Sequence, residues 1–289
     1  MKVHRIRRLS IGAVALAAVV GIGLTSCEPA PDTYVALGDS YTAGPLILNQ
    51  SLEPLGCLRS DRNYPRIAKP QIKAAKFVDV SCSGATTSDF FEEQGVTPGP
   101  NPPQFNALNA NTKVVTIGIG GNDIGFSSIV KNCATLDPFS SGCKGDYVVN
   151  GVDALAKKID ATAPKIDKVL VETKKRAPNA KIFVVGYPTI IPETGSGCWP
   201  VVPIVAGDIT YLRGVAKKLN AMLKARAVAN GATYVDTATS SIGHDMCSSS
   251  KWVEAIVPTT DAAPVHPNAS GMRNTGNVVA TAINAVVTS

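Results

Sequence analysis

The chain has 289 residues, of which 45% are hydrophobic, with 28 Lys and Arg against 22 Asp and Glu. Four of the basic residues and no acidic residue lie within the first 26 positions, which leaves 24 basic against 22 acidic side chains in the remainder. This near-neutral balance argues against a nucleic-acid-binding surface, so we expect no nucleic-acid partner. About 260 residues are enough to bury a substantial core, in one large α/β domain or in two smaller ones.

The first 26 residues predict an export signal. An apolar, uncharged segment from Ile11 to Leu24 follows a basic start that contains Lys2, Arg5, Arg7 and Arg8. The apolar segment is short for a membrane-spanning helix, and its flanks are those of a secretory signal. We therefore predict a signal peptide at residues 1–26, a short tether at 27–32 and a folded domain at 33–289.

Cys27 suggests how the exported chain is retained. The residues Leu24-Thr25-Ser26-Cys27 resemble the lipobox of bacterial lipoproteins, in which the cysteine is lipidated and becomes the first residue of the mature chain. The resemblance implies a lipoprotein that is held on the outer side of the cell membrane through Cys27. The alternative is an ordinary secretory signal that is cut nearby, which would make Cys27 incidental and the protein secreted.

Six further cysteines are suited to disulfides in an exported protein: Cys57, Cys82, Cys133, Cys143, Cys198 and Cys247. An even number permits three bridges, and the residues alone leave the pairing open, although Cys133 and Cys143 share one loop-like segment. No C-x-x-C unit occurs and the chain has only three histidines. We therefore expect no metal site of Cys/His type and no cofactor.

Strand-like and helix-like segments alternate along the chain. The strand-like runs, rich in β-branched residues, are Tyr34–Leu37, Phe77–Val80, Val114–Ile119, Ile182–Val185 and Thr233–Val235. Helical spacing is found in Tyr64–Ala75, Val152–Lys175, Val205–Ala229 and Asn268–Val287. Alternating strands and helices favour a parallel sheet with helices on both faces, and reactive groups in such folds gather at the carboxyl ends of the strands.

Each of the first three predicted strands ends in a turn of small and polar residues. The first turn is Gly38-Asp39-Ser40, the second contains Ser83-Gly84-Ala85, and the third is Gly120-Gly121-Asn122-Asp123. Glycine permits tight turns and allows a ligand to approach the backbone. Ser40 is open to two interpretations, because serine is common as a helix N-cap and is also a nucleophile.

These three turns, followed by His266 in "APVHPNASG", form an ordered set that resembles the SGNH family of GDSL hydrolases. The similarity extends from Ser40 to His266, and the chain also resembles secreted actinobacterial lipases. It implies an α/β three-layer sandwich with a parallel, five-stranded, flavodoxin-like sheet. It also implies an esterase or lipase that acts on a small-molecule or lipid ester, and we expect a monomer.

The resemblance assigns a role to each motif residue. Ser40 matches the nucleophile and His266 the general base, whereas the backbone N–H groups of Ser40 and Gly84 and the side-chain amide of Asn122 match the oxyanion hole. The chemistry requires these groups, because an alcohol needs a base to take its proton and the tetrahedral oxyanion needs donors. His244 is the other histidine of the domain and is expected near the Cys247 bridge or at the rim of the site, without a catalytic role.

The position three residues before His266, where the family has an acidic residue, is occupied by Ala263. We therefore predict a dyad in which the Ala263 carbonyl accepts a hydrogen bond from the imidazole. The alternative is a triad in which Asp261 takes that place. The resemblance to secreted lipases also implies the pairing Cys57–Cys82, Cys133–Cys143 and Cys198–Cys247.

The predicted function is therefore an exported serine ester hydrolase that forms an acyl-enzyme on Ser40. A carbohydrate O-acetylesterase and a non-catalytic surface lipoprotein that binds lipid or glycan are the alternatives. Apolar residues at Leu46–Leu48 and Cys198–Val205 could line an acyl channel or simply pack their loops. The sequence leans towards lipidic or simple acyl esters and does not define the natural substrate.

Overall fold

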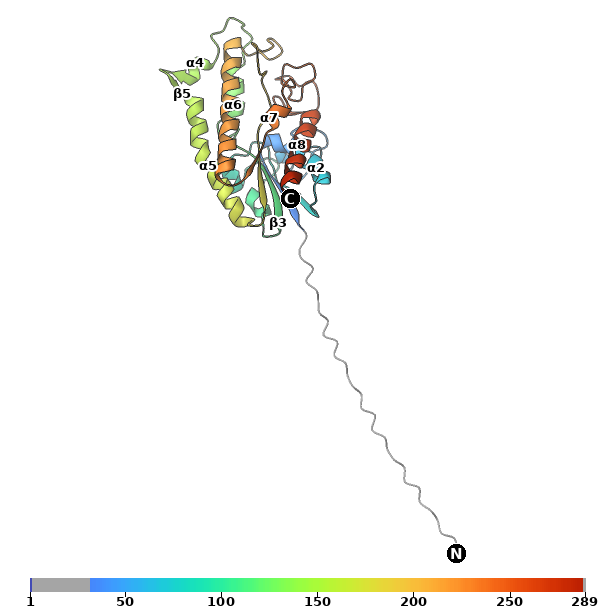
Figure 1. The fold of residues 1–289 in the computed structure, drawn as a ribbon. Helices are drawn as coiled ribbons and strands as arrows, with labels where there is room; N and C mark the ends of the chain where they lie inside the picture. The colour runs from blue at the N-terminus through green and yellow to red at the C-terminus, as the bar shows by residue number, and fades with distance from the viewer. Residues whose placement is uncertain (2–31, 288–289) are drawn as a thin grey trace. The chain divides into compact units, whose positions relative to one another are not determined.

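Five parallel strands form the central sheet of the computed structural model, which describes Met1 and residues 32–287 (Figure 1). The strands are β1 (Thr33–Gly38), β2 (Lys76–Asp79), β3 (Thr112–Gly118), β6 (Lys181–Val185) and β7 (Thr233–Val235). They lie in the order β2-β1-β3-β6-β7, and every neighbouring pair is parallel. This is the flavodoxin-like order, so the predicted sheet is confirmed.

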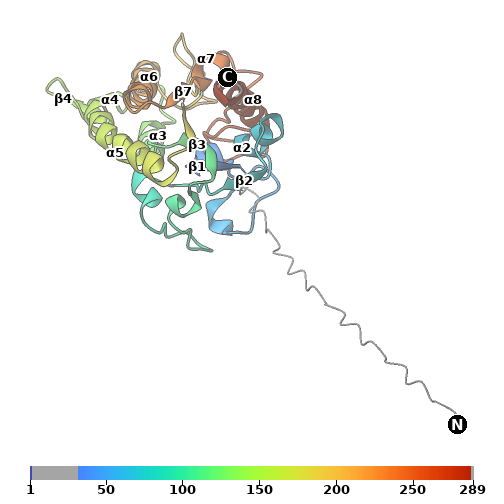
Figure 2. The same cartoon turned by 60° about the horizontal axis from the view of Figure 1, so that its bottom comes forward.

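Helices cover both faces of this sheet (Figures 1 and 2). One face carries α5 (Ala154–Arg176) and α6 (Ala206–Ala229), and the other carries α2 (Tyr64–Ala68) and α8 (Ala269–Val287). In β1, Val35 and Leu37 join the core on the α5–α6 side, whereas Tyr34 and Ala36 join the core on the α8 side. Successive side chains of a strand point to opposite faces, so a strand buried on both sides is apolar throughout. The predicted three-layer sandwich is confirmed.

The helices differ from the prediction in two places. Helical spacing predicted one helix over Tyr64–Ala75, but α2 ends at Ala68 and a 3₁₀ turn with Pro70 in it follows at Lys69–Gln71. Proline lacks the N–H that continues the α-helical ladder. The pattern also missed α3 (Phe126–Cys133), which follows the third turn.

The remaining elements are short. The helices are α1 (Ser40–Ala43), α4 (Lys144–Tyr147) and α7 (Thr237–Ser240), and 3₁₀ turns lie at Leu55–Cys57, Thr87–Phe90 and Gln104–Ala107. An antiparallel pair is formed by β4 (Val148–Val149) and β5 (Val152–Asp153). The three 3₁₀ turns each contribute a buried residue to the core, namely Cys57, Phe90 and Phe105, but these short elements leave the topology of the sheet unchanged.

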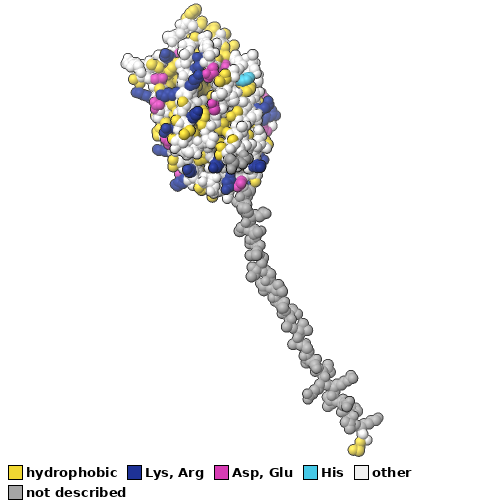
Figure 3. All heavy atoms as spheres, viewed as in Figure 1, with side chains coloured by type: hydrophobic (Ala, Val, Ile, Leu, Met, Phe, Trp, Pro, Cys, Tyr) yellow, Lys and Arg dark blue, Asp and Glu magenta, His cyan; other side chains and the backbone are white. Residues whose placement is uncertain are grey.

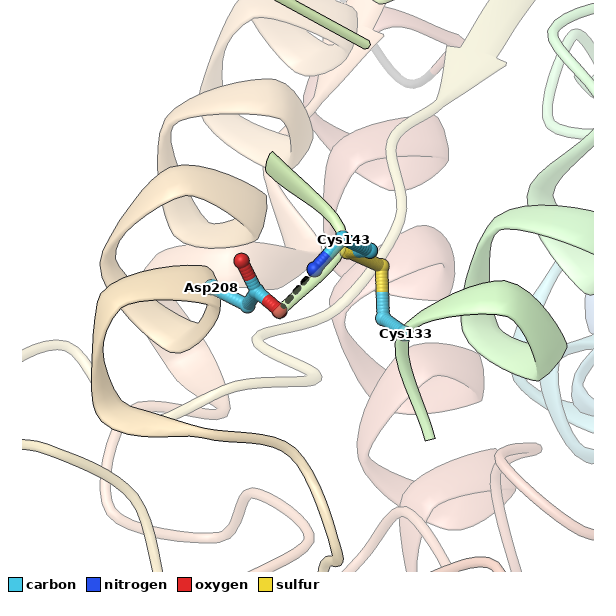
Figure 4. Close-up of side chains that lie close together, drawn as sticks. All are labelled: Cys133, Cys143 and Asp208. Carbon is cyan, nitrogen blue, oxygen red and sulfur yellow. Dashed lines mark hydrogen bonds between the residues drawn. A yellow bond between two sulfur atoms is a disulfide. The ribbon is translucent and has the colours of Figure 1, made fainter. Parts of the chain in front are cut away.

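Three disulfides join Cys57 to Cys82, Cys133 to Cys143 and Cys198 to Cys247, which confirms the predicted pairing. Figure 4 shows that Asp208 lies beside the second of them. The Asp208 carboxylate accepts hydrogen bonds from the backbone N–H groups of Cys143 (2.6 Å) and Lys144 (3.0 Å). Both sulfurs are in the disulfide and the carboxylate is occupied by the backbone, so this cluster fixes the loop rather than offering thiolate ligands.

The predicted signal at 1–26 and Cys27 in the tether lie outside the described residues, apart from Met1. Within residues 32–287, no helix is both long enough and apolar enough to cross a bilayer. On the face drawn in Figure 3, Lys and Arg side chains are interspersed with Asp and Glu. Export and anchoring remain predictions from the sequence.

Candidate active site

Ser40 is the first residue of the one-turn helix α1, and only Asp39 separates it from the end of the interior strand β1. The preceding residue, Asp39, is the N-cap, and its Oδ1 accepts a hydrogen bond of 2.8 Å from the Tyr41 N–H. The capping role that the sequence left open for Ser40 therefore belongs to Asp39. This leaves the Ser40 hydroxyl free for another partner at the carboxyl edge of the sheet.

That partner is His266, whose Nε2 lies 2.8 Å from Ser40 Oγ across 226 residues of chain. The other ring nitrogen, Nδ1, lies 2.7 Å from the backbone carbonyl oxygen of Pro264. A carbonyl only accepts hydrogen bonds, so Nδ1 carries the hydrogen and Nε2 of the neutral ring accepts from the Ser40 hydroxyl. Burial lowers the pKa of His266, and its hydrogen bond to Pro264 offsets part of that shift.

The prediction that the Ala263 carbonyl holds the ring was wrong by one residue. The Ala263 carbonyl accepts the backbone N–H of His266 at 3.2 Å and so closes a turn through Pro264 and Val265. Proline in the second position and a positive φ in the third, here 63° at Val265, are the features of a type II turn. The turn uses the Ala263 carbonyl, so the Pro264 carbonyl is the one that accepts the hydrogen bond from the imidazole. Both ring nitrogens have partners other than Asp261, which is exposed.

Val265 is a strained residue beside the His266 ring. Positive φ is rare for a β-branched side chain and persists where surrounding contacts enforce it, often at active sites. The hydroxyl of Tyr41 donates to the Val265 carbonyl at 2.6 Å, and the Val265 N–H donates to Ala255 at 3.3 Å. Tyr41 thus connects the serine helix to the histidine turn.

The third turn brings Asn122 to the same cavity as Ser40 and His266. One N–H of its amide donates to the Ala85 carbonyl at 2.9 Å, which ties the third turn to the second and leaves the other N–H available. Gly84 precedes Ala85 in an exposed turn with φ of 81°, a conformation that favours glycine. Gly84 is not among the residues that line the cavity.

A buried tyrosine that the sequence did not indicate connects the first and third turns. The Tyr187 hydroxyl donates to Asp39 Oδ2 at 2.5 Å and accepts the Gly121 N–H at 2.7 Å. Burial raises the pKa of Asp39 to about 7, although hydrogen bonds from Tyr187 and Tyr41 act in the opposite direction. Tyr187 lies two residues beyond β6, so its place after a strand end was the available signal.

Two sequence expectations concern residues that lie elsewhere. The ring of His244 stacks on Trp252 with centroids 3.6 Å apart, and its Nδ1 lies 2.6 Å from the Ser250 carbonyl, so it is not at the site. Neither Leu46–Leu48 nor Cys198–Val205 contributes to the lining of the cavity. The apolar lining comes instead from residues that no motif marked, namely Phe126, Ile190, Ala216 and Leu219.

Comparison with known proteins agrees with this geometry. Residues 36–273 match the model of the GDSL-like lipase/acylhydrolase family. The chain belongs to this family. It is 37% identical to Lipase 2 of Streptomyces coelicolor over 284 residues, which cover 93% of this chain and 94% of that protein. Lipase 1 of the same organism is 31% identical over 243 residues, 84% of this chain and 83% of that relative.

Solved structures of the family have the same fold. Phospholipase A1 from Streptomyces albidoflavus superposes with a TM-score of 0.73 at 29% identity, over 88% of this chain and 99% of that one. An extracellular lipase from Streptomyces rimosus gives a TM-score of 0.74 at 28% identity, over 87% and 99% of the two chains. The chain is accordingly a carboxylic ester hydrolase of the lipase/esterase type.

Proposed function

We propose that this enzyme cleaves esters through an acyl-enzyme on Ser40, with His266 as the general base. The observation that carries the proposal is the 2.8 Å hydrogen bond between Ser40 Oγ and His266 Nε2. A serine hydroxyl is a weak nucleophile until a neighbouring base accepts its proton as the new bond forms. The lowered pKa of His266 supports this role, because it keeps the ring neutral near pH 7.

The proposed reaction uses Ser40, His266 and the three oxyanion-hole donors that the sequence motifs predict. As Oγ attacks the ester carbon, its proton moves to Nε2, and the developing oxyanion is stabilised by the N–H groups of Ser40 and Gly84 and by the Asn122 amide. The imidazolium then gives its proton to the leaving alcohol, and a water molecule hydrolyses the acyl-enzyme by the same steps. The Pro264 carbonyl holds the ring tautomer without supplying a negative charge.

The enzyme acts outside the cell in this proposal, on lipidic or simple acyl esters. The signal-like residues 1–26 and the lipobox around Cys27 support export and anchoring to the cell membrane. Three disulfides are consistent with an oxidising compartment.

Labelling of the nucleophile tests the proposal directly. We expect a fluorophosphonate to add one phosphonyl group to the peptide that contains Ser40, and we expect Ser40→Ala to abolish both labelling and hydrolysis of p-nitrophenyl acetate. Ser128→Ala, at an exposed serine of α3, is the control and retains both. Labelling of a different residue, or turnover by folded Ser40→Ala protein, would rule out Ser40 as the nucleophile.

A further inference from the structure

An open groove adjoins the cavity around Ser40. Its volume is about 420 Å³, and apart from Lys131 and His266 the lining is apolar. One wall is α3 and the residue after it, and the other is Ile256 with the His266 turn; the lining residues are Phe126, Val130, Lys131, Ala134, Ile256, Pro264, Val265 and His266. Phe126 and His266 also line the inner cavity, so the two spaces adjoin at these side chains.

The inner cavity is much smaller than the groove. Its volume is about 20 Å³, which is room for about one water-sized group. Ile190, Ala216 and Leu219 close it on the side of α6. A hydrocarbon chain therefore finds its space in the groove rather than in the inner cavity.

The chemistry indicates which half of the ester lies in the groove. His266 must hand its proton to the oxygen of the leaving alcohol, so that oxygen lies on the His266 side of the tetrahedral carbon. The oxyanion points away from it, towards the Asn122 amide. The groove wall contains His266 but neither Ser40 nor Asn122.

Building on the proposed function, we propose that this groove binds the apolar alcohol portion of the ester. When the tetrahedral intermediate collapses, the bond between the carbonyl carbon and the alcohol oxygen breaks. The oxygen takes the proton from Nε2, and the free alcohol leaves along α3. The acyl portion remains on Ser40 in the inner cavity. The groove thus selects esters of hydrocarbon alcohols.

Two isomeric esters test the assignment in the unmodified enzyme. Hexyl acetate carries its chain on the alcohol and methyl heptanoate carries it on the acyl group, whereas methyl acetate has neither chain. We expect kcat/KM for hexyl acetate to exceed that for methyl heptanoate by about tenfold, which corresponds to the burial of about two methylene groups. Equal values, or a preference for methyl heptanoate, would overturn the assignment.

A variant and a binding measurement complete the test. Ala134→Phe fills the groove and should lower kcat/KM for hexyl acetate about tenfold while methyl acetate is unaffected. Ser128→Phe, an equally large residue on α3 outside the groove, should change neither. An equal effect of Ala134→Phe and Ser128→Phe on hexyl acetate would count against the groove.

Turnover of none of the three esters would overturn the proposed function instead. The assignment of the groove would then be tested by measuring the binding of 1-hexanol to the Ser40→Ala protein with saturation-transfer NMR. Binding that Ala134→Phe removes and Ser128→Phe preserves supports the groove, and absence of binding overturns it.

Discussion

Ser40 and His266 share one hydrogen bond, but different kinds of structure hold them. Ser40 follows β1, which is paired on both sides with β2 and β3, and the Asp39 N–H donates to the Gly118 carbonyl at 2.9 Å. His266 lies in the irregular segment before α8. Among the described residues, the β-type pairing of this segment is one isolated antiparallel bridge between Val253 and Pro267. The proposed nucleophile is therefore positioned by the sheet, whereas the proposed base is positioned by individual contacts.

One of the groups that make these contacts is the buried carboxylate of Glu254. Glu254 is fully buried, and it accepts hydrogen bonds from Asn268, Thr260 and Thr259, the last through both N–H and hydroxyl. Burial raises the pKa of Glu254, but these hydrogen bonds outweigh that effect and lower it overall. The Glu254 N–H also donates to the His266 carbonyl at 2.9 Å. Through its carboxylate Glu254 connects Thr259 and Thr260 with Asn268, and through its N–H it holds the backbone at His266.

Removal of the base is expected to have the largest effect. His266→Ala should lower kcat by a factor on the order of 10⁶, because the serine then has no acceptor for its proton. His244→Ala is the control, since that ring stacks on Trp252 away from Ser40. The measurement is p-nitrophenyl acetate hydrolysis, with the melting temperature as a check on folding. Comparable losses in the two variants would show that His266 acts only through structure.

Loss of an oxyanion donor tests the sheet-supported side. Asn122→Ala should reduce kcat by about 10²–10³ and leave KM nearly unchanged, because the amide acts on charge that develops in the transition state. Asn132→Ala, at an exposed amide on α3 that bonds Asp146 at 3.1 Å, should be neutral. A loss expressed in KM alone would indicate ground-state binding and remove Asn122 from the oxyanion hole.

The loop-supported side is tested by two carboxyl groups. Glu254→Gln places an amide N–H₂ among the groups that donate to the carboxylate, and it should cost about 2 kcal/mol of stability together with part of kcat. Asp261→Asn, at an exposed position, should change neither the melting temperature nor the rate. A collapse of turnover in folded Asp261→Asn would restore the aspartate triad that the hydrogen bonds of His266 argue against.

The same contrast explains what could be predicted from sequence. Ser40 and Asn122 follow continuous apolar runs that are rich in β-branched residues, which predicts strands, and parallel strands bring their carboxyl ends to one edge. The acceptor for His266 depends instead on a turn with positive φ at Val265, a conformation that its residue type disfavours. The sequence did not indicate Tyr187, because its partner Asp39 is remote in the chain. It did not indicate Glu254, because no motif marks the side chains that donate to this carboxylate.

A smaller effect on kcat is expected from the loss of the Tyr187 hydroxyl, which connects the first and third turns at the edge of the sheet. Tyr187→Phe removes the hydroxyl that bridges Asp39 and the Gly121 N–H, so kcat should fall about tenfold with little change in KM. Tyr211→Phe is the matched control, because it removes a hydroxyl that donates to Asp153 at 2.9 Å, and neither residue lines the cavity around Ser40. Equal effects of both changes on kcat would show that Tyr187 has no special role in positioning the site.

The smallest expected effect is a displacement of the pH profile. Only the neutral imidazole accepts the Ser40 proton, so kcat/KM for an uncharged ester rises as pH passes through the pKa of His266. Because burial lowers that pKa, the rise should be centred below pH 6.5, the ordinary value for histidine. Asp39, with a pKa raised to about 7, should add a second inflection, which Asp39→Asn removes while the lower one stays. A single rise above pH 6.5 in both proteins would mean that the ring is stabilised in its charged form, and that the uncharged Pro264 carbonyl does not act alone on Nδ1.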